Sequence, residues 1–314
     1  MLSGRKFCLK AAATVAALSV MIGWGIAGPE GETKKADAKP PVDDSKAIVE
    51  IKSSWLDKTI SPVTNPIFFE SPFIQTEVRP IFMYHEIDKS FVTRGGDVEV
   101  YAAQLRWAIT DRLALIATKD GYIDFNPEAG LTHEEGFADL AAGLKYALVK
   151  DDANELIVTP GFVFEIPMGN IDVFQGNGDG EWNLFTSAAK GFGNFHILGN
   201  VGFRIPNNWC DETAQAHYSL HLDYYTCKWF IPFVTLNGFT VLSEGKGLPL
   251  DNEGYDLINF GSSNAEGRSS LVFGVGMRSR VHKNVDVGFA WEKGLTTPKA
   301  LFDDRFTVDA IIHF

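Results

Sequence analysis

The sequence has few cysteines, few methionines and, after residue 27, no apolar run long enough to cross a membrane as a helix. It holds 3 Cys and 5 Met in 314 residues, and the lack of later apolar runs excludes a helical membrane bundle. Basic residues are also in deficit, because 28 Lys and Arg face 40 Asp and Glu. This balance argues against nucleic-acid binding, which needs clustered Lys and Arg. The 24 Phe and 30 Gly, in contrast, favour β-structure.

The first 27 residues are typical of a secretory signal. Three basic residues accompany an apolar stretch from Ala11 to Ile26, and small residues flank a cleavage site that ends at Ala27. We expect cleavage near Ala27, with an uncleaved anchor as the alternative.

The next segment, residues 28–70, has two parts. Residues 28–46 contain Pro, Gly and charge and almost nothing to bury, which predicts a disordered spacer. Residues 47–70 begin with apolar residues that suit one short helix and continue with prolines and phenylalanines. They form either a docked linker in the periplasm or a plug that packs into or under the main domain, which we place at residues 71–314.

Apolar and polar residues alternate along most of the remaining chain, which is the pattern of β-strands. In the last strand apolar residues recur from Phe306 to Phe314, with Thr307 and Asp309 between them. The predicted strands lie near residues 77–85, 97–109, 112–119, 138–146, 156–165, 182–191, 195–204, 217–225, 229–242, 271–278, 285–292 and 306–314.

The connections between these strands alternate in length. Short turns are expected near 110–111, 151–154, 193–194, 226–228 and 282–284, and long loops near 87–96, 123–135, 167–180, 206–215, 243–267 and 295–303. Short turns at one end and long loops at the other are typical of an up-and-down membrane barrel with an even number of strands. The sequence therefore predicts an all-β fold, an antiparallel up-and-down transmembrane β-barrel of about twelve strands with an N-terminal periplasmic segment.

In such a barrel the apolar faces contact lipid and the polar faces line the lumen. The polar faces carry both signs of charge, which indicates either ion pairs across a narrow solute path or pairs that simply fill the interior. The interior of a twelve-stranded barrel is intermediate in width between small barrels that are filled by side chains and large barrels that hold a wide channel. The candidate lumen residues are Glu77, Arg79, His85, Arg106, Asp139, Lys145, Glu165, His196, Arg204, His217, His221, Asp223, Arg278, Arg280, Asp286, Glu292 and Asp309.

Several stretches carry a family resemblance. GFADLAAGLKYAL (136–148), a strand with Pro160-Gly161, and GDGEWNLFTSAAKGFGNFHILGNVGFRIP (178–206) resemble the outer-membrane family named for the MetA pathway of phenol degradation. The resemblance covers most of residues 76–314 and its motifs are structural. It implies a transporter-like barrel for small, often aromatic compounds, and it offers no catalytic residues.

Three other patterns have a chemical and a structural interpretation. His217, Ser219 and Asp223 share one strand face, and His217-Tyr218-Ser219 is similar to the His-x-Ser of outer-membrane phospholipase A, although Leu220-His221-Leu222 follows it here. Two histidines four apart in a strand are roughly 13 Å apart and cannot share a metal unaided. The loop from Gln175 to Glu181 partly resembles a calcium loop but lacks its first and last acids, so a glycine-rich surface loop is expected.

The cysteines test the topology. Cys210 is expected in an extracellular loop and Cys227 at a periplasmic turn, so the strand between them keeps the two Cα atoms far beyond the roughly 7 Å that a disulfide allows. We predict no Cys210–Cys227 bond.

The function that these observations favour is an outer-membrane channel or transporter for a small solute, with a narrow polar lumen. The alternatives are a structural or surface-interaction barrel with a packed lumen and a lipid-acting hydrolase that uses His217 and Ser219. We expect no enzyme activity, no cofactor and no metal. The expected partners are outer-membrane lipid, a small solute, and the barrel-assembly machinery through the C-terminal strand that ends at Phe314.

Overall fold

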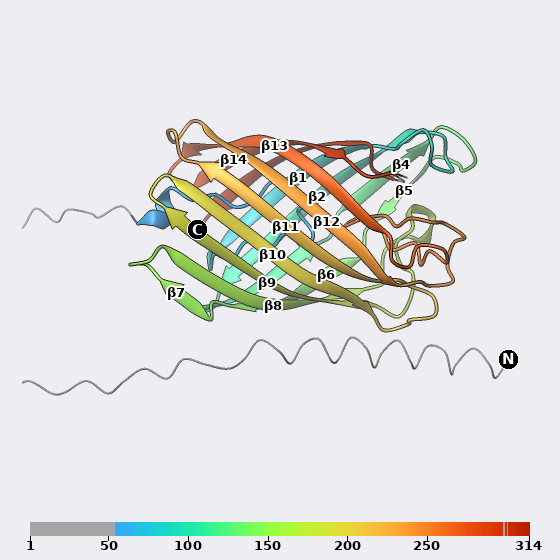
Figure 1. Cartoon of the computed structure of the whole chain (residues 1–314), viewed down its shortest axis with the longest axis horizontal. Helices are drawn as coiled ribbons and strands as arrows, with labels where there is room; N and C mark the ends of the chain where they lie inside the picture. Colours follow the sequence, from blue (N-terminus) through green and yellow to red (C-terminus); the bar gives the residue numbers. More distant parts are fainter. Residues whose placement is uncertain (1–53, 298, 300) are drawn as a thin grey trace, which may run out of the picture. The chain divides into compact units, whose positions relative to one another are not determined.

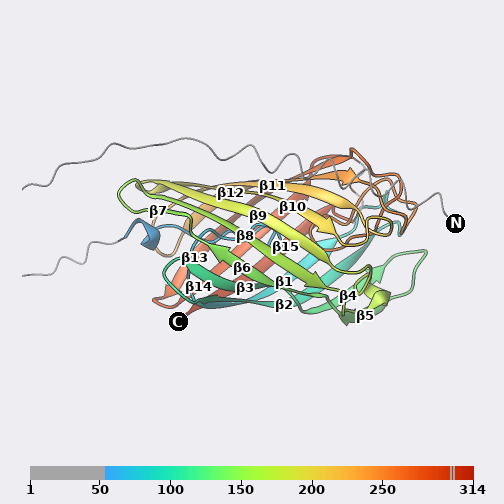
Figure 2. The ribbon, with the colours of Figure 1, turned by 90° about the horizontal axis from the view of Figure 1, so that it is seen from below.

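The chain forms one closed antiparallel sheet. The computed structural model describes residues 54–297, 299 and 301–314, so the predicted signal peptide, its cleavage site and the predicted spacer lie outside the described residues. The sheet closes because β1 pairs with β15 on one side and with β2 on the other, and Figures 1 and 2 show its strands tilted around one axis. In the described part of the chain no helix is long and apolar enough to cross a membrane.

Fifteen strands make twelve positions in the wall, because β3 continues into β4, β5 continues into β6, and β7 only extends the hairpin of β8. The predicted twelve-stranded barrel is therefore confirmed. The strands are β1 (Glu77–Glu86), β2 (Gly96–Ala108), β3 (Leu113–Lys119), β4 (Tyr122–Pro127), β5 (Glu134–Phe137), β6 (Leu140–Tyr146), β7 (Val149–Asp151), β8 (Leu156–Ile166), β9 (Glu181–Phe192), β10 (Phe195–Pro206), β11 (Ala214–Tyr224), β12 (Ile231–Ser243), β13 (Ser269–His282), β14 (Val285–Gly294) and β15 (Asp304–His313), with 3₁₀ turns η1 (Trp55–Asp57) and η2 (Ile171–Val173).

The two ends of the barrel differ, as the loop lengths predict. One end, which we call the turn end, carries the connections 109–112, 193–194, 225–230 and 283–284 and the chain terminus Phe314. The other, the loop end, carries 87–95, 128–133, 167–180, 207–213, 244–268 and 295–303. By analogy with bacterial barrels, we expect the turn end to face the periplasm and the loop end to face the outside.

Two predicted boundaries are wrong in the same part of the wall. The predicted loop 123–135 is mostly strand, because β4 and β5 occupy it and leave only residues 128–133. The predicted strand 138–146 begins at Leu140, and Ala138 and Asp139 before it are both buried. Alternation restarts at this break, so Ala138 turns inward although it precedes Leu140 by two residues.

Side-chain polarity reverses along single strands, which marks the edge of the membrane. In the turn-end half of β2, Leu105 and Trp107 are exposed and Arg106 is buried, as in a lipid-facing wall. In its loop-end half Val98 is buried and Glu99 faces outward. The wall therefore extends beyond the hydrocarbon on the loop-end side, where apolar residues point inward as in a soluble protein.

We expect the cost of a lipid-facing charge to depend on its depth. Val275→Arg, at the centre of β13 and 38% exposed, should lower the free energy of unfolding by about 2–4 kcal/mol. The matched variant Val281→Arg, 44% exposed near the turn end of the same strand, should cost about 0–1 kcal/mol. Denaturant unfolding in lipid vesicles measures both, and equal costs would contradict the orientation of β13 toward lipid.

Candidate functional site

The barrel interior is filled by the chain that precedes β1. Residues 54–76, which we call the inner segment, start at the turn end, where Trp55 Nε1 donates to Asp152 Oδ1 (3.2 Å) and Lys58 Nζ donates to Asn194 Oδ1 (2.8 Å). The segment returns to the same end, because Thr76 leads directly into β1. Between these points it forms a U inside the barrel.

Prolines explain why this segment binds the wall through side chains. Proline has no N–H and resists helix and ladder formation, so Pro62 and Pro72 suit the irregular arms of the segment, and Pro66 lies in the turn at its tip. Each of their carbonyls accepts a hydrogen bond from a side chain of the wall. The donors are Arg79 Nη2 to Pro62 (2.8 Å), Gln104 Nε2 to Pro66 (2.7 Å) and Thr159 Oγ1 to Pro72 (2.7 Å).

Glu70 makes the strongest contacts of the inner segment. Arg106 donates to it through two nitrogens, Nε to Oε1 at 2.8 Å and Nη2 to Oε2 at 2.6 Å, and Lys145 Nζ donates to Oε1 at 2.7 Å. All three side chains are buried. A bidentate arginine pair is geometrically specific as well as strong, so the position of residue 70 in the barrel is closely defined.

The tip of the U places one aromatic ring against three wall residues. Phe68 stacks on the imidazole of His217, with ring centroids 4.5 Å apart, and the Arg204 guanidinium lies 5.6 Å from the Phe68 centroid. Phe239 lies 6.4 Å away on another side. Asn65, beside the tip, donates from Nδ2 to Ser219 Oγ (3.1 Å).

Two glycines of the wall make room for this segment. A Cβ on Gly274 would lie 2.8 Å from Thr64 Cγ2, and one on Gly288 would lie 2.7 Å from Val63 Cγ2. Only glycine allows the segment to come this close to β13 and β14. Gly274 and Gly288 are thus part of the contact with the inner segment.

The remaining interior charges pair across strands. Asp309 accepts from Arg79 Nε (2.7 Å) and from both terminal nitrogens of Arg278 (2.8 and 2.9 Å), so one carboxylate faces two guanidinium groups. Arg305 contacts Glu292 and the loop residue Asp256, both at 2.8 Å. Buried charges need such partners because an isolated one costs far more than the pair.

A second cluster lies on β10 and β11. His196 Nδ1 and Asp223 Oδ1 are 2.6 Å apart, and His221 Nε2 lies 3.3 Å from Asp223 Oδ2. The three side chains are buried, and His221 is covered by Phe69 of the inner segment and by Phe233.

The Ser, His and acid pattern of β11 does not form a catalytic arrangement. His217 Nε2 bonds to Asn183 Oδ1 (2.8 Å), Ser219 bonds to Asn65, and Asp223 contacts two other histidines. Each member thus has a different partner, and all of them face the interior rather than lipid. Among the described residues no group of three or more His, Cys, Asp or Glu is placed to hold a metal ion.

The interior is apolar on one side, which corrects the expectation of a polar lumen. Inward residues of β1, β2 and β4 join the tip of the inner segment and the loops of the loop end. We call this set the interior apolar cluster: Ile67, Phe68, Ile81, Met83, Ile87, Val98, Val100, Ile123, Phe125, Ala138, Val173, Phe239, Tyr255, Leu257, Ile258, Phe260, Val272, Leu301 and Phe302.

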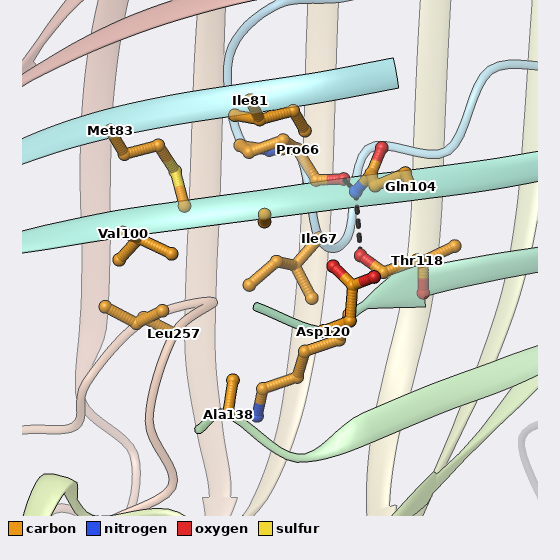
Figure 3. A pocket seen from close by; sticks show the side chains of 12 residues that line it. Pro66, Ile67, Ile81, Met83, Val100, Gln104, Thr118, Asp120, Ala138 and Leu257 are labelled. Carbon is orange, nitrogen blue, oxygen red and sulfur yellow. Dashed lines mark hydrogen bonds between the residues drawn. The ribbon is translucent and has the colours of Figure 1, made fainter. Parts of the chain in front are cut away.

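Little free space is left along the interior. Figure 3 shows Met83, Val100 and Leu257 around a cavity of about 10 Å³ beside Ile67, which is room for about one water. A much larger cavity, about 460 Å³, opens at the turn end between the inner segment and Arg280. Packing is therefore tight between the tip of the U and the loop end, and looser between the arms of the U and the turn end.

The predicted lumen residues lie on inward faces of the wall. Fifteen of the seventeen are buried, and Glu165 and Arg280 are partly exposed. Most are paired: Glu77 with Arg106, Glu165 with Lys119, Arg204 with Glu181, and Arg280 with Asp286. Asp139 binds backbone N–H groups of the loop 167–180, and His85 packs on Phe302. Their role in a solute path stays a prediction.

The sequence did not predict several ion-pair partners of the candidate lumen residues. Glu70 lies in a segment without alternating polarity, and Asp256 lies in a loop. Lys119 is turned inward by a register shift between Ala117 and Lys119. Arg305 and Glu181 could have been assigned to the interior from the sequence, because each lies one step of the period of two before an inward residue of its strand.

The cysteines lie at opposite ends of β11. Cys227 is exposed and free in the turn 225–230, and Cys210 belongs to the loop 207–213. The eleven residues of β11 span roughly 36 Å at strand rise, well beyond disulfide reach. This placement agrees with the prediction of no Cys210–Cys227 bond.

A carboxyl group at the loop end should make loop packing pH-dependent. Burial, with further repulsion from Glu181, raises the pKa of Glu212 from 4.5 to about 8. Between these two pKa values Glu212 is protonated in the folded loop 207–213 and ionised in the unfolded loop. The stability of the folded loop is therefore fully present below pH 4.5 and is lost as the pH rises towards 8. Hydrogen exchange of this loop, corrected for intrinsic rates, should quicken across that window. The change should vanish in Glu212→Gln and persist in Glu266→Gln, an exposed control; a pH trend that survives Glu212→Gln would refute the assignment.

Comparison with known proteins gives the fold. No protein-family model matches the chain, and no curated protein matches its sequence. A solved structure, the COG4313 outer membrane channel from Pseudomonas putida F1, is similar over 82% of this chain and 100% of its own, with a TM-score of 0.54 and 14% identity. The NanC porin (TM-score 0.49, 7% identity, 76% and 99% covered) and the outer membrane phospholipase A from Escherichia coli (0.39, 11%, 76% and 98%) are more distant, and these two carry no argument about this chain. The chain has the fold of an outer-membrane β-barrel, and the finer resemblance to the MetA-pathway family stays a prediction.

Proposed function

We propose that the protein is an outer-membrane channel for a small solute whose lumen is closed by its own inner segment. The observation that carries the proposal is the closure itself. The interior is blocked by a chain segment that starts and ends at the turn end, and not by wall side chains alone. A segment that is separate from the wall can leave the lumen once its buried contacts break, whereas a lumen filled by its own wall cannot open.

The two kinds of contact suit such a closure. Glu70 binds the wall through charge, and charged contacts lose much of their value once water reaches them. The proline carbonyls accept single hydrogen bonds that water can replace. The cavity of about 460 Å³ at the turn end already admits solvent next to the segment.

The solute class follows from the interior apolar cluster together with the family resemblance. Any path from the loop end past Phe68 meets apolar and aromatic side chains before it meets the paired charges. This favours a small, largely apolar solute, aromatic ones included, over a sugar or an ion. The paired charges of the wall then define the passage toward the periplasm.

A structural barrel with a packed lumen is the second candidate. The small cavities and the dense pairing of charges favour it. We do not propose a hydrolase, because His217 and Ser219 face the interior and bond to separate partners.

The proposed environment is the outer membrane, after signal cleavage near Ala27. The exposed apolar residues of the strands would contact lipid, and β15 with the exposed Phe314 would be the strand that the barrel-assembly machinery recognises.

We expect removal of the Glu70 contacts to open the channel. Glu70→Ala removes the carboxylate partner of Lys145 and leaves Arg106 with Glu77 alone, which weakens the closed state. Each 1.4 kcal/mol lost is a factor of ten in the closing equilibrium, so the open probability in a planar bilayer should rise at least about tenfold.

The control is Asp251→Asn, which removes an exposed pair with Arg268 and should leave the conductance unchanged. A second variant lacks residues 54–75 altogether. If both Glu70→Ala and this deletion are silent, although heat-dependent gel mobility shows them folded, the barrel is structural and the proposal fails.

A further inference from the structure

The guanidinium that binds Glu70 is also held by residues of the wall itself. Arg106 Nη2 donates to Gln104 Oε1 (3.0 Å), and Arg106 Nη1 lies 3.2 Å from Glu77 Oε1. Gln104 Nε2 in turn donates to the backbone oxygen of Thr118 on β3 (2.7 Å), as Figure 3 shows. All of these partners belong to the wall, so Arg106 keeps its orientation when the inner segment is absent.

The wall around Glu70 carries more positive than negative charge. Its buried ion pairs join four cationic side chains and two carboxylates, which are Arg79, Arg106, Lys145 and Arg278 with Glu77 and Asp309. The adjoining pair of Arg280 and Asp286, nearer the turn end, is balanced. Glu70 offsets one of the two surplus positive charges. Without the inner segment, this part of the wall therefore attracts an anion.

Apolar wall residues lie next to these charges, and they pack with the ring of Phe69. Phe69 is 1% exposed, and its cluster includes four small or medium apolar residues of the wall, Ala147, Ile157, Ala189 and Leu198. The His221 ring also contacts it edge-on, with centroids 6.3 Å apart. Ala147 follows Lys145 by two residues, so the apolar surface adjoins the ammonium group that binds Glu70. The wall therefore accommodates one ring and one carboxylate side by side.

Stability alone does not require charge at this site. Replacing a buried ion pair by well-packed apolar residues often leaves a protein equally or more stable. Apolar contacts of the kind that Phe69 makes would hold the segment without any buried lysine or arginine. The charged site has one further property, because it distinguishes a carboxylate from a neutral group of the same shape.

We propose that Phe69 and Glu70 occupy a solute site of the wall, which takes a compound with one aromatic ring and one carboxylate. Arg106 and Lys145 bind the carboxylate of the solute, and the apolar wall residues contact its ring. This inference rests on the proposed closure by the inner segment, and it adds a carboxylate to the largely apolar solute inferred above. Because solute and segment exclude each other, solute binding favours the open lumen.

Competition for the site is tested with phenylacetate, which carries one ring and one carboxylate. Phenylacetamide has the same shape without the charge, and acetate has the charge without the ring. Glu70 is tethered to β1 through residues 71–76, so a free solute has to compete with an effective concentration in the millimolar range. In a planar bilayer that holds the mature protein, about 10 mM phenylacetate should raise the open probability severalfold. Phenylacetamide and acetate should not change it.

Glu70→Ala gives a second measurement, because it vacates the site. Phenylacetate should then bind at a concentration at least about tenfold lower, reduce the ion current and raise the temperature of the heat-dependent gel shift. Adding Lys145→Met to Glu70→Ala should abolish this stabilisation. The matched addition of Lys293→Met, which removes a partly exposed lysine that pairs with Asp304 at the loop end, should preserve it.

The outcomes separate this site from the closure on which it rests. Phenylacetate that acts no differently from phenylacetamide or acetate would overturn the solute site. Ion steps of Glu70→Ala that phenylacetate leaves unchanged, with no shift of the gel transition, would leave the closure standing and reject the site. Stabilisation of Glu70→Ala by phenylacetate alone, without any ion steps, would support the site and reject closure by the inner segment.

Discussion

One buried carboxylate, that of Glu70, positions the inner segment in the lumen. The Glu70 carboxylate pairs with Lys145, and it shares Arg106 with Glu77 of β1. The other contacts of the inner segment, made by proline carbonyls and by the ring of Phe68, follow once residue 70 is in position. The wall thus relies on the inner segment for the partner of Lys145, whereas other buried charges, such as Arg79 and Asp309, pair between wall strands.

Alternation along the sequence was sufficient to predict the architecture, because in a membrane barrel one face of each strand contacts lipid and the other faces the polar interior. Alternation was insufficient where the outer face of a strand passes from lipid to water along its length. β2 is apolar outside near Leu105 and apolar inside near Val98, so a single period of two describes neither half fully. The same reversal hid β4 within a predicted loop, since Ile123 and Phe125 point inward there.

For the candidate site, the sequence predicted which strand residues face the interior but not which residues they pair with. Residues on regular strands, such as Arg79 and Asp309, were assigned to the interior from spacing alone, but their pairing depends on which strands become neighbours. Lys119 is turned inward by a register shift, and no local pattern predicts a shift of that kind. Glu70 belongs to a segment without any period, and its role depends entirely on where the segment packs.

The U shape of the inner segment has a topological consequence. Both of its arms reach the turn end, and the second arm continues directly into β1, the strand that closes the sheet against β15. The segment therefore passes through no loop and surrounds no strand. The withdrawal proposed above would therefore leave every hydrogen bond between β1 and β15 in place. Such an opening is compatible with a permanently closed cylinder, because the described part of the segment is joined covalently to the wall at Thr76 alone.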